Sequence, residues 1–182
     1  RRKGMKTLIA CGTKYGSTMT IGQWIAERLP FGSQVCDIKY APSPDDFELV
    51  ILGSAIYEGK TLPQFDKYID TYFQILEQRK TAIFVVCLDT KGVFVKGRVH
   101  GGWNYIMPVI NRFKTPPIHA GIMHGEINPS KLTPEDTEKL MHFYNQILHR
   151  NYSTPPYRTM MNKQEAWEFA EQILKKLKGE RY

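Results

Sequence analysis

The feature that most limits the fold of this chain is a repeated alternation of short apolar runs with amphipathic segments. The runs are continuously apolar, which is typical of strands buried on both faces of a parallel sheet. Because helical segments separate the runs, the order of elements predicts a doubly wound α/β fold with a five-stranded parallel sheet. We predict strands over residues 6–11, 34–38, 49–53, 81–88 and 118–123, of which 34–38 is the weakest.

Apolar side chains at helical spacing predict helices between the strands and after the last one. Thr133 has the position of an N-cap, with Pro134 and acidic residues in the first turn. Asn162 and Glu165 have the spacing of a capping box, in which the Glu165 carboxylate bonds back to the start of the helix. We expect Trp103 to anchor the third helix in the core. The predicted helices cover residues 18–29, 63–78, 99–113, 133–149 and the segment from 162 onward.

Residues 129–161 interrupt the alternation between the last predicted strand and the last helix. We interpret them as a helical insertion within a single domain that spans residues 5–182. A composition that is 42% hydrophobic supplies enough apolar side chains for a core of that size. Residues 1–4 precede Met5 with no apolar segment behind them, and we interpret them as a remnant of expression.

Charge and cysteine usage narrow the possible functions. Lys and Arg number 25 against 18 Asp and Glu, a net charge of +7, but the cations are scattered and form no basic stripe, so we expect no nucleic-acid partner. No apolar run approaches the roughly 20 residues that span a bilayer, and membrane contact is the less favoured alternative. The histidines and three isolated cysteines lack metal-ligand spacing, so we expect a cytoplasmic protein without a metal, in which Cys11 and Cys87 are inert thiols.

The loop after the first predicted strand is the strongest candidate for a binding site, because ligands of such sheets bind at the carboxyl ends of the strands. Gly16 is followed by Ser17 rather than Lys, and Lys14 replaces a required glycine, so neither the Walker A nor the dinucleotide pattern fits. Hydroxyls and backbone N–H groups that lead into a helix can hold a terminal phosphate. The alternative is a helix that Ser17 or Thr18 merely caps. The loop is Thr13, Lys14, Tyr15, Gly16, Ser17 and Thr18.

The loops after two further strands could flank a planar ligand. The first, after residue 53, consists of Ser54, Ala55, Ile56, Tyr57, Glu58 and Gly59; the second consists of Leu88, Asp89 and Thr90. Small residues at the start of the first loop would let a flat ring approach the backbone, and Tyr57 could stack on it. The alternative for Tyr57 is packing within its own loop.

These segments resemble the flavodoxin-like, FMN-binding family, in the branch that contains menaquinone-dependent protoporphyrinogen oxidase. The resemblance rests on residues 6–9 leading into 13–18, on residues 50–59, and on the final helix with Trp167. It implies a strand order of 2-1-3-4-5, with the FMN phosphate on residues 13–18. It also implies that residues 54–59 and 88–90 flank the isoalloxazine ring.

The same resemblance implies electron transfer, with a redox protein or a small-molecule electron acceptor as the partner. An FMN-dependent oxidase or dehydrogenase of the protoporphyrinogen or quinone type is the alternative, with residues 92–107 and 129–161 forming a substrate pocket. A binding module that has lost FMN is a third possibility. The sequence leaves the catalytic residues and the oligomeric state open.

Overall fold

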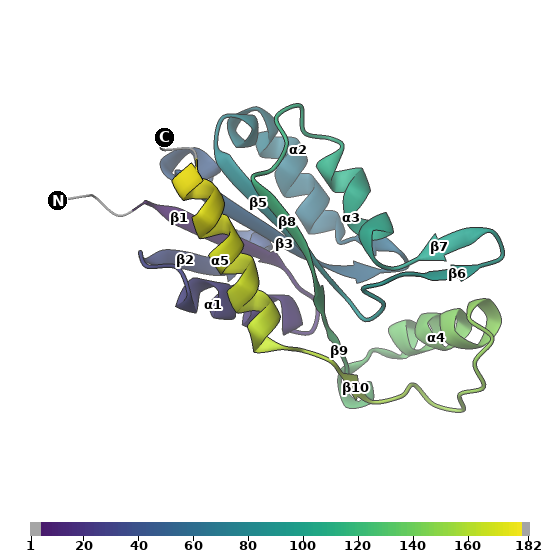
Figure 1. The fold of residues 1–182 in the computed structure, drawn as a ribbon. Helices are drawn as coiled ribbons and strands as arrows, with labels where there is room; N and C mark the ends of the chain where they lie inside the picture. Colours follow the sequence, from purple (N-terminus) through teal and green to yellow (C-terminus); the bar gives the residue numbers. More distant parts are fainter. Residues whose placement is uncertain (1–4, 180–182) are drawn as a thin grey trace.

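Five parallel strands form the central sheet in a computed structural model of the protein, which describes residues 5–179 except for the side chains of Val93 and Val95 (Figure 1). The interpreted remnant, residues 1–4, and residues 180–182 lie outside the described part. The strands are β1 (Thr7–Gly12), β2 (Ser33–Asp37), β3 (Leu49–Tyr57), β5 (Lys80–Cys87) and β8 (His119–His124). Their order, β2-β1-β3-β5-β8, confirms the expected order 2-1-3-4-5 of the parallel strands.

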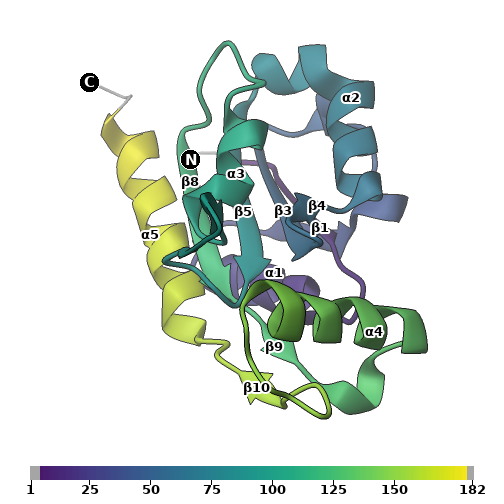
Figure 2. The same cartoon turned by 90° about the vertical axis from the view of Figure 1, so that its right-hand side faces the viewer.

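Helices cover both faces of the sheet, as Figures 1 and 2 show. Helices α1 (Ser17–Glu27) and α5 (Lys163–Gly179) pack on one face, and α2 (Pro63–Glu77) and α3 (Trp103–Ile110) pack on the other. Each face has its own buried cluster, which explains why the strands are apolar on both sides. The first cluster centres on Ile9, Ile25, Phe84 and Phe169, and the second on Leu8, Leu52, Phe65 and Ile83.

Strand β3 is four residues longer than the predicted strand 49–53, because a tight hairpin extends it. The chain turns at Glu58 and Gly59, whose φ angles are 53° and 75°, and returns as β4 (Lys60–Thr61), antiparallel to β3. Positive φ at both central residues is the geometry of a two-residue hairpin turn. Residues 54–57, expected in a loop, therefore form the end of a strand.

The predicted helix 99–113 is shorter than expected, because a second hairpin precedes it. Strands β6 (Val93–Val95) and β7 (Arg98–His100) pair antiparallel, and α3 begins only at Trp103. Gly101 and Gly102, with φ angles of 92° and 59°, separate the hairpin from the helix. The expected core position of Trp103 is wrong, because its side chain is 53% exposed.

The segment between β8 and α5 forms a separate layer at the end of the sheet. It contains β9 (Glu126–Ile127), helix α4 (Pro134–His142), a π-helical turn (Phe143–Ile147) and β10 (Arg158–Thr159), which pairs with β9. The Thr133 hydroxyl accepts the N–H of Asp136 at 3.1 Å, which confirms the expected N-cap. Short 3-10 turns lie at Ile38–Tyr40, Pro44–Asp46 and Pro129–Lys131.

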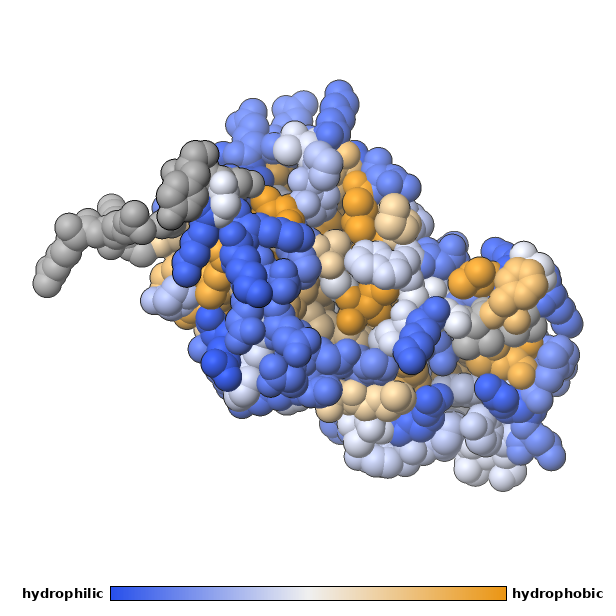
Figure 3. All heavy atoms as spheres, viewed as in Figure 1, coloured by the Kyte–Doolittle hydropathy of each residue, from blue (hydrophilic) through white to orange (hydrophobic). Residues whose placement is uncertain are grey.

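The surface of the molecule is mixed in character, with apolar side chains gathered over the β6–β7 hairpin (Figure 3). Phe94 is 73% exposed there, and Val99, Trp103 and Met107 are also exposed. Within residues 5–179, no helix is both long enough and apolar enough to cross a membrane.

Candidate functional site

The candidate site lies where β1, β3 and β5 end, the edge at which ligands bind in doubly wound sheets. Residues 13–18, which we call the phosphate loop, connect β1 to α1. The hairpin turn after β3 and residues 88–90 after β5 stand on neighbouring strands, since β3 pairs with both β1 and β5. The topology thus brings the three predicted loops to one edge of the sheet.

The phosphate loop is held open by a glycine. Gly16 is the N-cap of α1, its φ is 102°, and no side chain caps the helix. The Gly16 N–H donates instead to the Thr13 hydroxyl at 2.8 Å, which fixes the turn. The alternative interpretation, in which Ser17 or Thr18 only caps α1, is therefore wrong.

Thr18 has a buried side chain without a hydrogen-bonding partner in the described part of the chain. Its Oγ1 makes no hydrogen bond with any described residue. Burying a hydroxyl without a partner costs about 1–3 kcal/mol, so such groups need an explanation. Beside it, a Cβ added at Gly16 would meet no described atom within 4 Å, apart from its chain neighbours.

The small residues at the end of β3 have a packing role. A Cβ at Gly53 would lie 2.1 Å from Cζ of Phe84, so this glycine makes room for the Phe84 ring. The buried Ser54 hydroxyl accepts the N–H of Leu62 at 3.0 Å and donates to the carbonyl of Ala55 at 2.8 Å. Its side chain is thus engaged within the fold. Ala55 and Ile56 are half-buried at the end of the strand.

Tyr57 packs next to the phosphate loop. Its ring centroid lies 6.2 Å from that of Tyr15, and the Lys14 ammonium lies 5.4 Å from the Tyr57 centroid. Burial, together with the nearby Tyr15 and Asp136, raises the pKa of Tyr57 well above its usual range, so the phenol stays protonated. The side chains of Lys14 and Tyr15 in the phosphate loop and of Tyr57 at the end of β3 thus form one aromatic and cationic surface.

Helix α4 covers the outer side of this surface, a contact that the sequence analysis missed (Figure 2). The Asp136 carboxylate accepts the Tyr15 hydroxyl and pairs with the Lys14 ammonium. One turn further along α4, Lys139 lies 3.4 Å from the Glu58 carboxylate. The helix therefore contacts both the phosphate loop and the hairpin after β3.

The Asp136 contact predicts a pH-dependent stability. Burial opposes ionisation of Asp136, but the hydrogen bonds from Lys14 and Tyr15 outweigh it and lower the pKa of the carboxyl. A lowered pKa in the folded state stabilises the protein above the unfolded-state pKa, and this stabilisation is lost as the pH falls through the folded-state pKa. We expect Asp136→Asn to lower the free energy of unfolding by about 1 kcal/mol at pH 7, because Lys14 is largely exposed.

Urea unfolding at a series of pH values checks this expectation. The difference between the unchanged protein and Asp136→Asn should close as the pH is lowered from 5 to 2. Glu138→Gln, which removes an exposed carboxylate from the same helix, is the matched control and should change stability by less than about 0.5 kcal/mol. An Asp136→Asn effect that does not change with pH would contradict the assignment.

Residues 88–90, which follow β5, also contact the segment between β8 and α5, the layer that contains α4. Leu88 packs with Ile127, Tyr144 and Leu148 of the segment between β8 and α5. The Asp89 carbonyl accepts the N–H of Gly102 at 2.6 Å, so the β6–β7 hairpin closes against this loop. The Thr90 hydroxyl lies 3.0 Å from Nε2 of His124, at the end of β8.

The thiols near the site are protonated at neutral pH. Burial raises the pKa of Cys87 to about 11 and raises that of Cys11 further. A protonated thiol is a poor nucleophile and metal ligand. Within residues 5–179, no group of three His, Cys, Asp or Glu side chains is placed to hold a metal ion.

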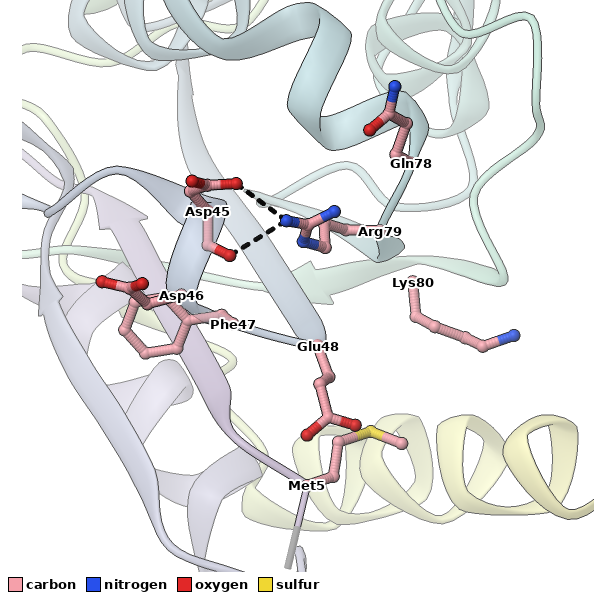
Figure 4. A pocket seen from close by; sticks show the side chains of 8 residues that line it. All are labelled: Met5, Asp45, Asp46, Phe47, Glu48, Gln78, Arg79 and Lys80. Atoms are coloured by element: carbon pink, nitrogen blue, oxygen red, sulfur yellow. Dashed lines mark hydrogen bonds and ion pairs between the residues drawn. The ribbon is translucent and has the colours of Figure 1, made fainter.

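A hollow of about 380 Å³ lies at the opposite edge of the sheet, near the amino ends of β3 and β5 (Figure 4). Arg79 crosses it and donates to the Asp45 carboxylate and carbonyl, both at 2.9 Å. Its lining is mixed, with Met5 and Phe47 beside charged side chains, and the edge is not the one at which doubly wound sheets bind ligands. We assign it no role in the candidate site.

The fold and the loops define a doubly wound α/β protein whose first strand–helix junction is an open glycine turn. The chain belongs to the flavodoxin domain family, whose model matches residues 8–154. No curated protein matches the sequence.

Solved structures of the same fold cover nearly the whole chain. Oxidised flavodoxin 1 from Bacillus cereus is 15% identical with a TM-score of 0.54, and the match covers 93% of this chain and 97% of that one. A flavodoxin from the domain Archaea is 14% identical with a TM-score of 0.50, covering 93% and 99%. A WrbA-like flavodoxin from Agrobacterium tumefaciens is 12% identical with a TM-score of 0.50, covering 96% and 98%.

Proposed function

We propose that this protein binds one FMN at the phosphate loop and transfers electrons between a redox protein and an acceptor. Its membership of the flavodoxin family supports this role. The observation that carries the proposal is the buried, unpartnered hydroxyl of Thr18 beside the open position at Gly16. A phosphate there would accept from Thr18 and from backbone N–H groups at the start of α1, where the helix dipole favours negative charge.

The ring of FMN would lie between the hairpin after β3 and residues 88–90. Tyr57 and Asp89 are then the side chains placed to flank it, while Glu58 adds negative charge at the hairpin. Redox chemistry is supplied by the cofactor when it is bound, and the protein positions it and sets its surroundings. Ser54 contributes through its backbone, since its hydroxyl is engaged by Leu62 and Ala55.

Titration of the cofactor-free protein with FMN, followed by visible absorption and calorimetry, tests this proposal. We expect one FMN per chain with a perturbed spectrum. Thr18→Val keeps the shape of the side chain and removes its hydroxyl, so it should weaken FMN binding about 10- to 100-fold, the value of one hydrogen bond to a charged group. The cofactor-free Thr18→Val protein should be as stable as the unchanged protein or more so, because a buried unpartnered hydroxyl has been removed.

Thr71→Val is the matched control. Thr71 is an exposed threonine on α2 whose hydroxyl bonds within its own helix, to the carbonyl of Lys67 at 2.8 Å. Its replacement should leave FMN affinity unchanged. Equal affinities for Thr18→Val and the unchanged protein would place the phosphate elsewhere, and a chain that retains no FMN would leave only the family fold.

An FMN-dependent oxidoreductase of the protoporphyrinogen or quinone type is the second candidate function. The observation that favours it is the layer formed by residues 129–161, an insertion in a single domain, which packs against both the phosphate loop and Leu88. Such a layer can border a substrate as well as the cofactor. Turnover of a porphyrinogen or a quinone by the FMN-loaded protein distinguishes this candidate from a simple carrier.

For both candidate functions we place the protein in the cytoplasm, where cysteines such as Cys11, Cys36 and Cys87 stay reduced.

A further inference from the structure

A carboxylate, an imidazole and a hydroxyl are hydrogen-bonded in series at the edge of the candidate site. Both Glu165 oxygens lie within 3.0 Å of Nδ1 of His124, and one of them also accepts the backbone N–H of His124 at 3.3 Å. On the other side of the ring, Nε2 of His124 lies 3.0 Å from the Thr90 hydroxyl.

The Glu165 carboxylate thus faces His124 rather than the N-terminus of its own helix, and the expected capping-box bond from Glu165 is wrong. Asn162 alone caps α5, accepting the N–H of Gln164 at 2.9 Å.

A neutral His124 ring beside a carboxylate gives the hydrogen bonds one consistent direction. An ionised carboxylate can only accept, so the proton between Glu165 and His124 belongs to Nδ1. In a neutral imidazole protonated at Nδ1, Nε2 carries the lone pair and accepts from the Thr90 hydroxyl. The Thr90 oxygen then keeps its own lone pairs free to accept a proton from a ligand.

The position of the series connects it to the site. Thr90 stands in the loop after β5 that the proposed function places beside the flavin ring, three residues after the end of the strand. His124 ends β8, which pairs with β5, and its side chain is 25% exposed. Glu165 lies in the first turn of α5, whose packing on the sheet fixes it. Thr90, at one end of the series, therefore belongs to the loop proposed to flank the ring. His124, in the middle, is partly exposed to solvent.

We propose that Thr90, His124 and Glu165 form a proton-transfer chain for the flavin site. Thr90 is the catalytic residue, which exchanges a proton with a bound hydroxyl-bearing electron donor, and His124 and Glu165 position it and take up its proton. The proposal rests on the proposed function, since it needs a cofactor that receives the electrons. Such a proton-transfer chain is suited to electron transfer that is coupled to proton transfer.

The proton balance is simple. A hydroquinone-type donor becomes a quinone by losing two electrons and two protons. The cofactor would take up both electrons and one proton; the O–H bond of the second donor hydroxyl breaks, and its proton passes to the Thr90 oxygen. The original Thr90 proton forms an N–H bond at Nε2 of His124. The Glu165 carboxylate stabilises the resulting imidazolium, which returns the proton to solvent. In quinone reduction the same atoms carry a proton in the opposite direction.

The first test needs no cofactor. In ¹⁵N spectra of the FMN-free protein at pH 8, the His124 ring should be protonated at Nδ1 and unprotonated at Nε2. His119 is an internal control of the opposite form, because its Nδ1 accepts from the Lys176 ammonium at 2.8 Å. Burial, with Lys176 nearby, lowers the pKa of His119 to about 4, so this ring stays neutral. Glu165→Leu should shift His124 toward the Nε2-protonated form, and a His124 already protonated at Nε2 in the unchanged protein would overturn the proposal.

The second test compares two electron acceptors in the FMN-loaded protein after its reduction. Reduction of 2-methyl-1,4-naphthoquinone takes up protons, whereas reduction of ferricyanide takes up electrons alone. Thr90→Val, which removes the hydroxyl, should slow quinone reduction at least about 100-fold, the lower end of the range for lost acid–base catalysis. Thr90→Ser, which keeps the hydroxyl, should stay within about threefold of the unchanged protein. The quinone rate divided by the ferricyanide rate, measured with saturating FMN in each variant, should therefore fall at least about 100-fold in Thr90→Val and by less than about threefold in Thr90→Ser.

The possible failures are distinguishable. If no FMN binds, the proposed function fails, and the three residues have no proton to transfer. The ¹⁵N spectrum of His124 still reports whether their hydrogen bonds exist. If FMN binds but Thr90→Val reduces the quinone as fast as Thr90→Ser, the proposed function stands and the proton chain is overturned. Equal slowing of both acceptors would show that Thr90 only shapes the loop, which also overturns it.

Discussion

Gly16→Asp is expected to weaken FMN binding about 100- to 1,000-fold, the largest effect of any single change at the site. The position is open, since a Cβ at Gly16 meets no described atom within 4 Å beyond its chain neighbours. An aspartate there would place a carboxylate beside the phosphate. Repulsion between unit charges about 4 Å apart near a protein surface is about 4 kcal/mol, which corresponds to this loss of affinity. Calorimetric titration with FMN measures it.

Gly16→Ala separates charge from backbone strain. Both variants place a side chain at a φ of 102°, which costs about 1–2 kcal/mol of stability in each. Only the aspartate adds charge, so Gly16→Ala should bind FMN within about tenfold of the unchanged protein. Riboflavin, which has no phosphate, should bind Gly16→Asp and Gly16→Ala equally. Similar FMN affinities for the two variants would mean that the phosphate does not lie at this helix start.

Gly53→Ala is expected to destabilise the cofactor-free protein by about 3 kcal/mol. The added Cβ would lie 2.1 Å from Cζ of the fully buried Phe84 ring, so strand or ring must move. Overpacking of this kind costs about 1–3 kcal/mol and sometimes more. Urea unfolding measures the change, and thermal unfolding should show a fall of roughly 6–12 °C in Tm for a chain of this length.

Gly32→Ala and the double variant Gly53→Ala/Phe84→Leu test whether the contact with Phe84 causes the loss of stability in Gly53→Ala. A Cβ at Gly32 meets no described atom within 4 Å beyond its chain neighbours, so Gly32→Ala should change stability by less than about 0.5 kcal/mol. If Phe84 is the obstacle, Phe84→Leu should cost at least about 1 kcal/mol less in the Gly53→Ala protein than in the unchanged one. Additive effects would show that the strain lies elsewhere.

The fold could be predicted because its strands and helices are specified by patterns among neighbouring residues. Continuous apolar runs and helical spacing each depend on a few neighbouring residues, and every predicted parallel strand and covering helix is present. The two hairpins were missed because glycines determine them. Gly59 permits the turn after β3, and Gly101 with Gly102 ends the β6–β7 hairpin where a helix was expected. A Glu-Gly pair within an apolar run was a signal for the first turn, and a Gly-Gly pair before Trp103 was a signal for the second.

The site was only partly predictable, for the same reason. The phosphate loop is a local turn between a predicted strand and a predicted helix, so its place in the fold could be predicted from the order of residues, whereas the burial of Thr18 depends on the packing of α1. The contacts of Asp136 with Tyr15 and of Glu165 with His124 join segments far apart in the chain, and no local pattern specifies them. Glu165 shows the limit clearly, because its spacing from Asn162 favours a capping bond. The end of β8 lies beside the start of α5 and offers it a histidine instead.

The contact between α4 and the phosphate loop also has a consequence for the order of events on the ribosome. Tyr15 is 121 residues ahead of its partner Asp136. At synthesis rates of roughly 5–20 residues per second, the loop leaves the ribosome about 6–24 s before the helix that covers it. During that interval the nascent chain can already contain β1, α1 and the hairpin after β3. A cofactor captured during translation thus meets a loop that α4 has not yet closed, whereas one that binds the finished protein must pass beside the helix.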